Sequence, residues 1–203
     1  MLKFKQFISE EKKGGLHIFD IDDTLFHTTA KVGVKSASGQ TRTLSNADYN
    51  TDTRKPGEQY DYSEFRSADK FSKESKPISK MLGKLNSIHA NVKKSPGSKV
   101  IINTARSDFD DKDKFLNTFK KHGVDIDDIH VHRAGNIESD EPVAAKKSMA
   151  IKHHLDSNKY RHATLYDDSK PNLDHFLSLK AEYPHMKFNA YHVQPNGSVK
   201  RHK

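Results

Sequence analysis

The sequence contains no cysteine among its 203 residues. The chain therefore has no disulfide, no thiolate ligand for zinc and no cysteine nucleophile, and this composition is compatible with a reducing cytoplasm, where we expect the protein to act. Long apolar runs are also missing. Because none approaches the roughly 20 residues that span a bilayer, we expect no association with a membrane.

Residues 1–13 mix lysines with large apolar side chains and lack the uninterrupted apolar stretch and cleavage site of a signal peptide. This mixture predicts a short amphipathic N-terminal helix that Gly14 and Gly15 end. The length of the chain is sufficient for one hydrophobic core with a local insertion, but not for a second large domain.

The formal net charge is +8. A field of this sign concentrates polyanions and phosphorylated ligands near the surface, and nucleic acid is the first candidate partner. The lysines are scattered rather than clustered, however, so their excess is equally consistent with a role in solubility alone.

Four short apolar runs end in polar residues and are predicted to be buried strands. They cover residues 16–19, 100–102, 129–131 and 163–166. Helical patterns alternate with them over residues 78–92, 112–122, 147–155 and 173–180. The alternation predicts an α/β fold, with a Rossmann-like parallel sheet sandwiched by helices and formed by residues 14–27 and 77–203. Ligands of such sheets bind at the carboxyl ends of the strands.

Residues 28–76 interrupt this alternation and are polar, with several glycines and a proline. Val32 and Val34 precede a Ser38-Gly39 turn, and Thr41 follows it, which predicts a β-hairpin. We expect this insertion to form a small cap or flap beside the functional site. A second hairpin is expected over residues 193–200, where Asn196-Gly197 is a typical turn sequence.

Asp20, Asp22 and Thr24 stand at alternate positions directly after the first predicted strand. Carboxylates held this close repel one another, so an ordered cluster of them usually has a cation to neutralise it. Mg²⁺ suits such hard oxygen ligands. Helix capping would explain one of these residues but not all of them.

The segment resembles the first motif of the haloacid dehalogenase superfamily, which has the form Asp-x-Asp-x-Thr after a hydrophobic strand. Residues that fit the three later motifs follow in the order of the family: Thr104 after the second strand, Lys147 before a helix, and Asp167 with Asp168 after the fourth strand. Lys147 is preferred to its neighbour Lys146 because it places apolar residues at the expected positions of the helix.

The resemblance implies a phosphatase in which Asp20 attacks the phosphoryl phosphorus and forms an aspartyl phosphate. Asp22 would protonate the leaving alcohol and then activate the water that cleaves the intermediate. The resemblance also implies that Mg²⁺ is bound by Asp20, the Asp22 backbone carbonyl, Asp167 and Asp168. Thr104 and Lys147 would stabilise charge on the phosphoryl oxygens. Thr24 and Arg106 would bind the substrate.

Thr104-Ala105-Arg106 is similar to the Ser-Gly-Arg segment of polynucleotide kinase 3'-phosphatase domains. This similarity implies a phosphate-ester substrate at a nucleic-acid end, with Arg106 binding a phosphate. A surface ion pair of Arg106 with Asp108 or Asp110 is an alternative. The chain has no Gly-x-x-x-x-Gly-Lys-Ser/Thr loop, so it lacks the kinase half of those bifunctional enzymes.

Two other functions remain open. One is a phosphatase for nucleotides or other small phosphate esters, with Tyr60, Tyr62 and Phe65 closing over the ligand, although these aromatic residues are also typical of a small core. The other is a catalytically silent protein of the same fold that binds nucleic acid. Zinc binding by the histidine pairs at residues 130–132 and 153–154 lacks an evident third ligand.

Overall fold

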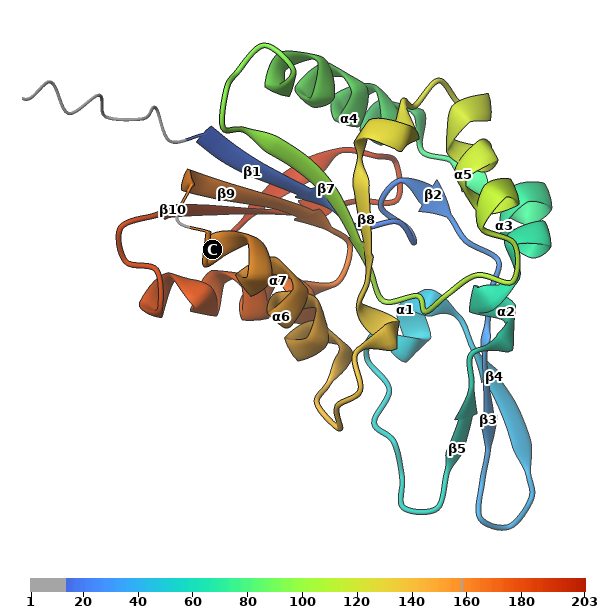
Figure 1. The fold of residues 1–203 in the computed structure, drawn as a ribbon. Coiled ribbons are helices and arrows are strands. Elements are labelled where there is room, and N and C mark those ends of the chain that lie inside the picture. The colour runs from blue at the N-terminus through green and yellow to red at the C-terminus, as the bar shows by residue number, and fades with distance from the viewer. Residues whose placement is uncertain (1–13, 158) are drawn as a thin grey trace, which may run out of the picture.

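The computed structural model describes residues 14–157 and 159–203, and the helix expected over residues 1–13 lies outside them. Six strands form the main sheet (Figure 1). Their order is β11 (Val199–His202), β10 (Lys187–Val193), β9 (Tyr160–Asp167), β1 (Gly14–Phe19), β7 (Lys99–Thr104) and β8 (His130–Arg133). All neighbours are parallel except β10 and β11. The fold is therefore α/β with a mainly parallel sheet, as the sequence predicts.

Helices cover both faces of this sheet (Figure 1). α4 (Ser79–Val92) and α5 (Lys112–Lys121) lie on one face, and α6 (Val143–Leu155) and α7 (Lys170–Ser178) lie on the other. Successive side chains of β1 alternate between the two layers, since Leu16 and Ile18 pack with α6 and α7 while Phe19 packs with α4 and α5. None of the helices in the described part of the chain is long and apolar enough to cross a membrane.

Two glycines open the central strand. Gly14 and Gly15 are the first residues of β1, and the helix that they are expected to end lies outside the described residues. A Cβ atom on Gly14 would lie 2.2 Å from the backbone of Gly97, and one on Gly15 would lie 2.1 Å from the ring of His162. The backbone of Gly97 leaves no room for a side chain at position 14, and a side chain at position 15 would require the His162 ring to move.

The structure differs from the prediction at two further places. α6 begins at Val143, earlier than residue 147, because Pro142 precedes its first turn with a φ of −56° and so directs the chain into a helix there. β10 extends the parallel sheet over a stretch for which no strand was predicted. The expected hairpin then joins β10 to β11, with Gly197 at a φ of +74° in its turn.

The order of the strands creates a crevice beside β1. The chain runs outward from β1 to β7 and β8, and then returns to the other side of β1 to form β9 and β10. Such a reversal leaves a crevice outside the carboxyl ends of the strands. Phe19 and Tyr166 are in register, so Asp20 and Asp167 emerge side by side at this edge.

The 28–76 segment leaves and re-enters the core at one place, because β2 (Phe26–His27) pairs with β6 (Lys76–Pro77). Between them a three-stranded antiparallel sheet has the order β4, β3, β5. The elements of the segment are β3 (Val32–Lys35), β4 (Thr41–Leu44), α1 (Asn46–Tyr49), β5 (Gln59–Asp61), α2 (Ser63–Arg66) and α3 (Ala68–Glu74). Strands β3 and β4 form the hairpin that the sequence predicts, whereas β5 is an additional strand. A separate small core holds this sheet together.

Candidate functional site

Three aspartates meet at the carboxyl ends of β1 and β9. Asp20 follows β1, Asp167 ends β9, and Asp168 comes next in the chain. One carboxylate oxygen from each lies within 4.8 Å of those of the other two. Asp20 and Asp167 are buried, whereas Asp168 is partly exposed. The structure thus brings together acids that are almost 150 positions apart in the sequence.

Lys147 connects two of these acids. It lies in the second turn of α6, and its Nζ donates hydrogen bonds of 2.7 Å to Asp20 Oδ1 and 2.7 Å to Asp167 Oδ2. Its side chain is buried with them. The adjacent Lys146 lines the nearby cavity instead. Of the two lysines considered from the sequence, Lys147 is therefore the one that lies between the acids.

Asp167 is also fixed from the start of α7. Its Oδ1 accepts hydrogen bonds from the backbone N–H of Ser169 at 2.9 Å and from the side-chain amide of Asn172 at 2.9 Å. Together with Lys147, these donors satisfy a carboxylate that has no exposure to solvent. Asp167 consequently has little freedom to move, and it orients the ammonium group of Lys147 toward Asp20.

The ammonium group of Lys147 does not offset the desolvation of these acids and their mutual repulsion. Burial raises the pKa of Asp20; the ammonium of Lys147 opposes this shift, and Asp167 and Asp22 add to it. Burial also raises the pKa of Asp168, and Asp167 and Asp20 raise it further. Burial alone would lower the pKa of Lys147, but the carboxylates of Asp167 and Asp20 raise it above its ordinary value. The cluster therefore favours an additional cation.

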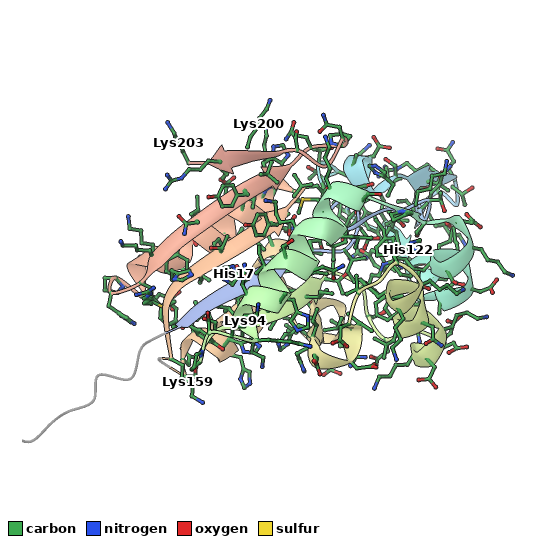
Figure 2. The ribbon with its side chains drawn as sticks, turned by 90° about the horizontal axis from the view of Figure 1, so that it is seen from above. His17, Lys94, His122, Lys159, Lys200 and Lys203 are labelled. Carbon is green, nitrogen blue, oxygen red and sulfur yellow. The ribbon has the colours of Figure 1, made fainter. Side chains whose placement is uncertain are left out.

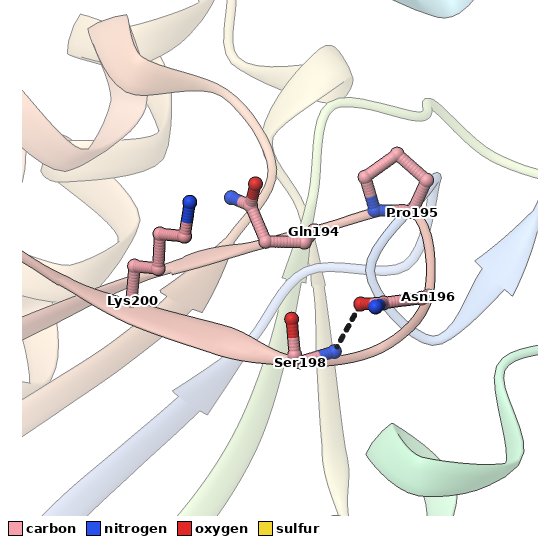
Figure 3. A pocket seen from close by; sticks show the side chains of 5 residues that line it. All are labelled: Gln194, Pro195, Asn196, Ser198 and Lys200. Carbon is pink, nitrogen blue, oxygen red and sulfur yellow. Dashed lines mark hydrogen bonds between the residues drawn. The ribbon is translucent and has the colours of Figure 1, made fainter.

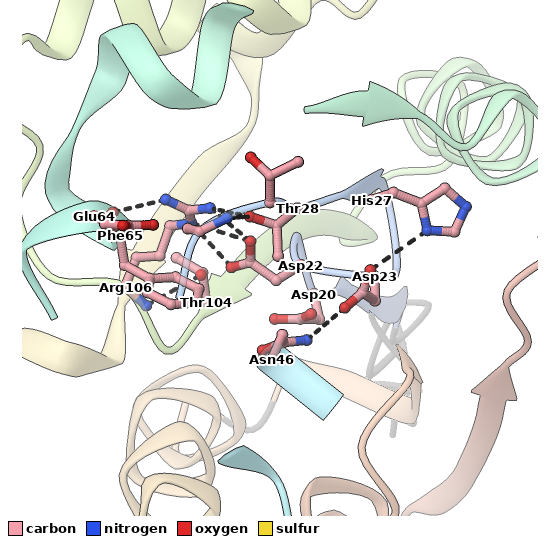
Figure 4. A network of polar contacts seen from close by, with 12 residues as sticks. Asp20, Asp22, Asp23, His27, Thr28, Asn46, Glu64, Phe65, Thr104 and Arg106 are labelled. Atoms are coloured by element: carbon pink, nitrogen blue, oxygen red, sulfur yellow. Dashed lines mark hydrogen bonds and ion pairs between the residues drawn. The ribbon is translucent and has the colours of Figure 1, made fainter. Parts of the chain in front are cut away.

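Asp22 lies beside this cluster and is paired with Arg106 (Figure 4). Arg106 Nε lies 2.9 Å from Asp22 Oδ2, and Nη2 lies 2.6 Å from Oδ1. The remaining donors of the guanidinium bond the carbonyl of Phe65 at 2.7 Å and the hydroxyl of Thr28 at 3.1 Å. The same group faces aromatic rings, with Cζ 4.9 Å from the centroid of Phe65.

This geometry corrects the alternative interpretation of Arg106 as a surface ion pair. Its side chain is 1% exposed and its acidic partner is Asp22. Asp108 instead pairs with Arg133 at 3.1 Å, and Asp110 accepts a hydrogen bond from the backbone of Ala68. Sequence proximity suggested the wrong acids because the true partner lies 84 positions earlier.

Two threonine candidates lie away from the open cavity. Thr104 and Thr24 are fully buried, and neither lines the cavity beside the acids. The Thr104 hydroxyl accepts a hydrogen bond of 3.2 Å from the backbone N–H of Arg106, and so helps to shape the loop after β7. The Thr24 hydroxyl has no hydrogen-bond partner among the described residues. In this conformation both residues contribute to the protein interior.

A cavity of about 650 Å³ opens over the acids. Its walls come from the loops after the sheet strands and from the 28–76 segment, which contributes Asn46, Tyr49, Asn50 and Arg54 among others. The Asn46 amide bonds Asp23 Oδ2 at 2.9 Å, so the segment is attached to the loop after β1. Sequence reasoning missed these four residues because nothing in a polar insertion distinguishes them from ordinary surface residues.

The charged groups that line this cavity are six acids and four bases, a formal charge of −2 in a protein of net charge +8. The acids are Asp20, Asp22, Asp52, Asp140, Glu141 and Asp168, and the bases are Arg54, Arg106, Lys146 and Lys147. A divalent cation would bring the formal charge to zero. An anionic ligand would otherwise meet net repulsion at the base of the cavity.

Three other features do not match this convergence of groups. A concavity of about 430 Å³ at the β10–β11 turn is lined by five residues of one hairpin and has no carboxylate (Figure 3). In Figure 2, Lys200 and Lys203 lie near each other, at a different place on the surface from Lys94 and Lys159. His132 of β8 and His154 of α6 bring their Nε2 atoms to 2.5 Å. Within the described chain, however, the three aspartates are the group of three ligands close enough to share an ion.

The candidate site therefore combines a buried carboxylate at Asp20, an ammonium group, and two further acids within reach of one cation. Hard oxygen ligands in this arrangement are suited to Mg²⁺, and the adjoining cavity is open to a ligand. Comparison with protein-family models, with curated proteins and with solved structures gave no match to this chain.

Proposed function

We propose that this protein is a Mg²⁺-dependent phosphomonoesterase of the haloacid dehalogenase type, with Asp20 as the nucleophile. The observation that carries the proposal is the position of Lys147, which bonds both Asp20 and Asp167 beside a third acid. A buried ammonium held between two carboxylates opposes the effect of burial on the pKa of Asp20 and orients its carboxylate. The same ammonium is available to the oxygens of a phosphoryl group that approaches Asp20.

The residues present fit a magnesium ion. Asp20, Asp167 and Asp168 supply carboxylate oxygens within 4.8 Å of one another, and oxygen is the ligand that Mg²⁺ requires. The formal charge of −2 on the cavity wall matches that of the ion in magnitude. When bound, the ion would neutralise charge on the phosphoryl oxygens and favour attack by an anionic nucleophile.

The chain's own residues account for the two chemical steps. An oxygen of Asp20 attacks phosphorus, the bond from phosphorus to the ester oxygen breaks, and the departing alcohol takes a proton from Asp22. Asp22 then removes a proton from water, which attacks the phosphorus of the aspartyl phosphate and releases inorganic phosphate and free Asp20. Arg106 bonds both oxygens of Asp22 and fixes this carboxylate next to the nucleophile, so one oxygen must leave Arg106 before Asp22 can carry the proton that it gives to the alcohol.

The preferred substrate is the 3'-phosphate end of a polynucleotide. The basic charge of the chain attracts polyanions, and the cavity is open at the surface, which a strand end requires. A nucleotide or another small phosphate ester is the second candidate, because the 28–76 segment contributes aromatic walls that favour a compact organic ligand.

Phosphate release from a panel of phosphate esters, with Mg²⁺ and with EDTA, tests the proposal. Asp20→Asn keeps the size of the side chain but cannot attack phosphorus, so we expect turnover to fall by roughly ten-thousand-fold or more. Asp127→Asn, at an exposed position on a 3₁₀ turn, is the matched control and should retain full activity.

The competing binding function has a different outcome. If the wild-type protein releases no phosphate from any ester in Mg²⁺ but binds DNA or RNA with an affinity that falls steeply with salt, the protein is a nucleic-acid-binding module and the phosphatase proposal is wrong. Equal turnover by the wild type and by Asp20→Asn would also contradict it.

A further inference from the structure

Three tyrosines converge on one wall of the cavity over the acids. Tyr49 ends α1, Tyr60 lies in β5, and Tyr62 directly precedes α2. Their ring centroids are separated by 6.0 Å for Tyr49 and Tyr60, 5.8 Å for Tyr49 and Tyr62, and 6.2 Å for Tyr60 and Tyr62. All three line the cavity that also contains Asp20 and Lys147. We refer to them as the tyrosine wall.

Contacts behind the tyrosine wall hold it in place. Tyr49 and Tyr60 pack against the small core of the 28–76 segment, and the Tyr60 hydroxyl donates to Asp52. The hydroxyls of Tyr49 and Tyr62 lie 3.1 Å apart. The guanidinium of Arg54 stands 5.1 Å from the Tyr60 ring centroid and is itself bonded to the carbonyl of Glu58. A ligand therefore meets rings that are already ordered, which reduces the entropy lost on binding.

Packing within the segment does not account for Tyr62. The small core is built from Val32, Val34, Leu44 and Phe65 with Ala30, and Tyr62 is not part of it. Tyr62 is 40% exposed, and it is one of the two large apolar side chains that are exposed in the described part of the chain. An aromatic ring left in contact with water at the mouth of a polar cavity is typical of a ligand-binding surface.

We propose that the tyrosine wall binds the nucleobase of the substrate whose phosphate reaches Asp20. This inference rests on the proposed phosphatase function and narrows its substrate to phosphate esters that carry a base. The sugar separates base from phosphate in every nucleotide, so one ligand can contact both the acids and a more distant wall of the same cavity. Stacking on aromatic side chains is tolerant of base identity, because every base has a π-face.

Comparison of substrates with and without a base tests the inference. One pair consists of a nucleoside 3'-monophosphate and ribose 3-phosphate, and the second pair consists of a 3'-phosphorylated oligonucleotide and the same strand with an abasic terminal nucleotide. Tyr62→Ala should lower kcat/KM for the base-bearing member of each pair by about 5- to 150-fold, the value of one stacked base. It should leave the base-free member unchanged, while Tyr62→Phe retains the preference because the ring remains.

Met149→Ala is the matched control, since Met149 is the other exposed large apolar residue and does not line the cavity. This variant should leave kcat/KM unchanged for both substrates of each pair. The two pairs also distinguish a strand end from a free nucleotide as the substrate. A preference for the base-bearing substrate that is found only in the oligonucleotide pair identifies a strand end. The same preference found only in the monophosphate pair identifies a free nucleotide. An equal effect of Tyr62→Ala on base-bearing and base-free esters would overturn the inference.

Calorimetric binding to Asp20→Asn separates this inference from the proposed function. Tighter binding of nucleoside monophosphates than of ribose phosphate, lost on adding Tyr62→Ala, supports the base site even if the wild type hydrolyses nothing. Equal affinity for the two ligands overturns the base site even if the wild type is an active phosphatase.

Discussion

Arg106 and Asp22 form a buried two-bond ion pair, with Nε 2.9 Å from Oδ2 and Nη2 2.6 Å from Oδ1. Both side chains are almost inaccessible to solvent. The pair also joins two parts of the chain, because Arg106 bonds the carbonyl of Phe65 in the 28–76 segment. The orientation of Asp22 is therefore coupled to the position of that segment.

We expect Arg106→Met to lower the free energy of unfolding by about 3–5 kcal/mol, since it leaves the Asp22 carboxylate buried without a partner. The double variant Asp22→Asn/Arg106→Met should be more stable than this single variant, because no uncompensated charge remains. Urea denaturation of both proteins gives the comparison. Equal free energies of unfolding for the single and double variants would show that the unpaired Asp22 carboxylate does not cause the loss of stability.

Lys147→Met should abolish phosphatase activity and destabilise the fold, because Asp20 and Asp167 then face each other without the ammonium between them. Lys146→Met removes the same charge from the adjacent position and should retain most activity, since Lys146 makes no contact with these acids in the structure. Steady-state turnover and thermal unfolding of the two variants provide the measurement. A greater loss of activity in Lys146→Met would exchange the roles that we assign to these lysines.

Mg²⁺ should raise the melting temperature of the wild-type protein, because an ion that binds only the folded state stabilises it, by about 2.7 kcal/mol at 100 times its dissociation constant. Asp168→Asn should weaken this response, since it removes one of the three carboxylates that can share the ion. The melting temperature measured across a Mg²⁺ titration, with a Na⁺ titration of equal ionic strength as the control, gives the result. An identical response in the variant would place the ion elsewhere.

His132 and His154 should lower the free energy of unfolding as the pH falls from about 6.5 to about 4, against an opposite contribution from Asp20 and Asp168, whose pKa values burial raises. Burial, with neighbouring histidines, lowers the pKa of His132 from 6.5 to about 3, and burial with Lys99 lowers that of His154 to about 4. In this range the unfolded chain takes up protons at both sites and the folded protein does not, so protonation favours unfolding. His132→Gln should remove the His132 contribution from the pH dependence, as measured by urea denaturation at several pH values. An unchanged slope would assign the effect to other groups.

The features that depend on local patterns could be predicted from the amino-acid sequence. Short apolar runs that end in polar residues, and helical runs of period 3.6, predicted four strands of the main sheet and the helices that cover it. The acids at residues 20 and 22 were found because they end a buried strand, and the edge at which they would lie follows from the rules of parallel sheets. These inferences needed only neighbours along the chain.

Tertiary structure decided the features that depend on partners far apart in sequence. The requirement for glycine at positions 14 and 15 arises from Gly97 and His162, which no local pattern reveals. The strand β10 was not predicted from the sequence, and in the structure it extends the sheet by pairing in parallel with β9.

The partners within the candidate site were decided in the same way. Lys147 differs from Lys146 only in the direction that α6 gives its side chain, and Arg106 meets Asp22 across 84 positions. The tyrosine wall forms only when α1, β5 and the start of α2 are folded onto one small core. Residue types and periodicity specify which elements form, whereas the distances between side chains on different elements are set by how those elements pack together.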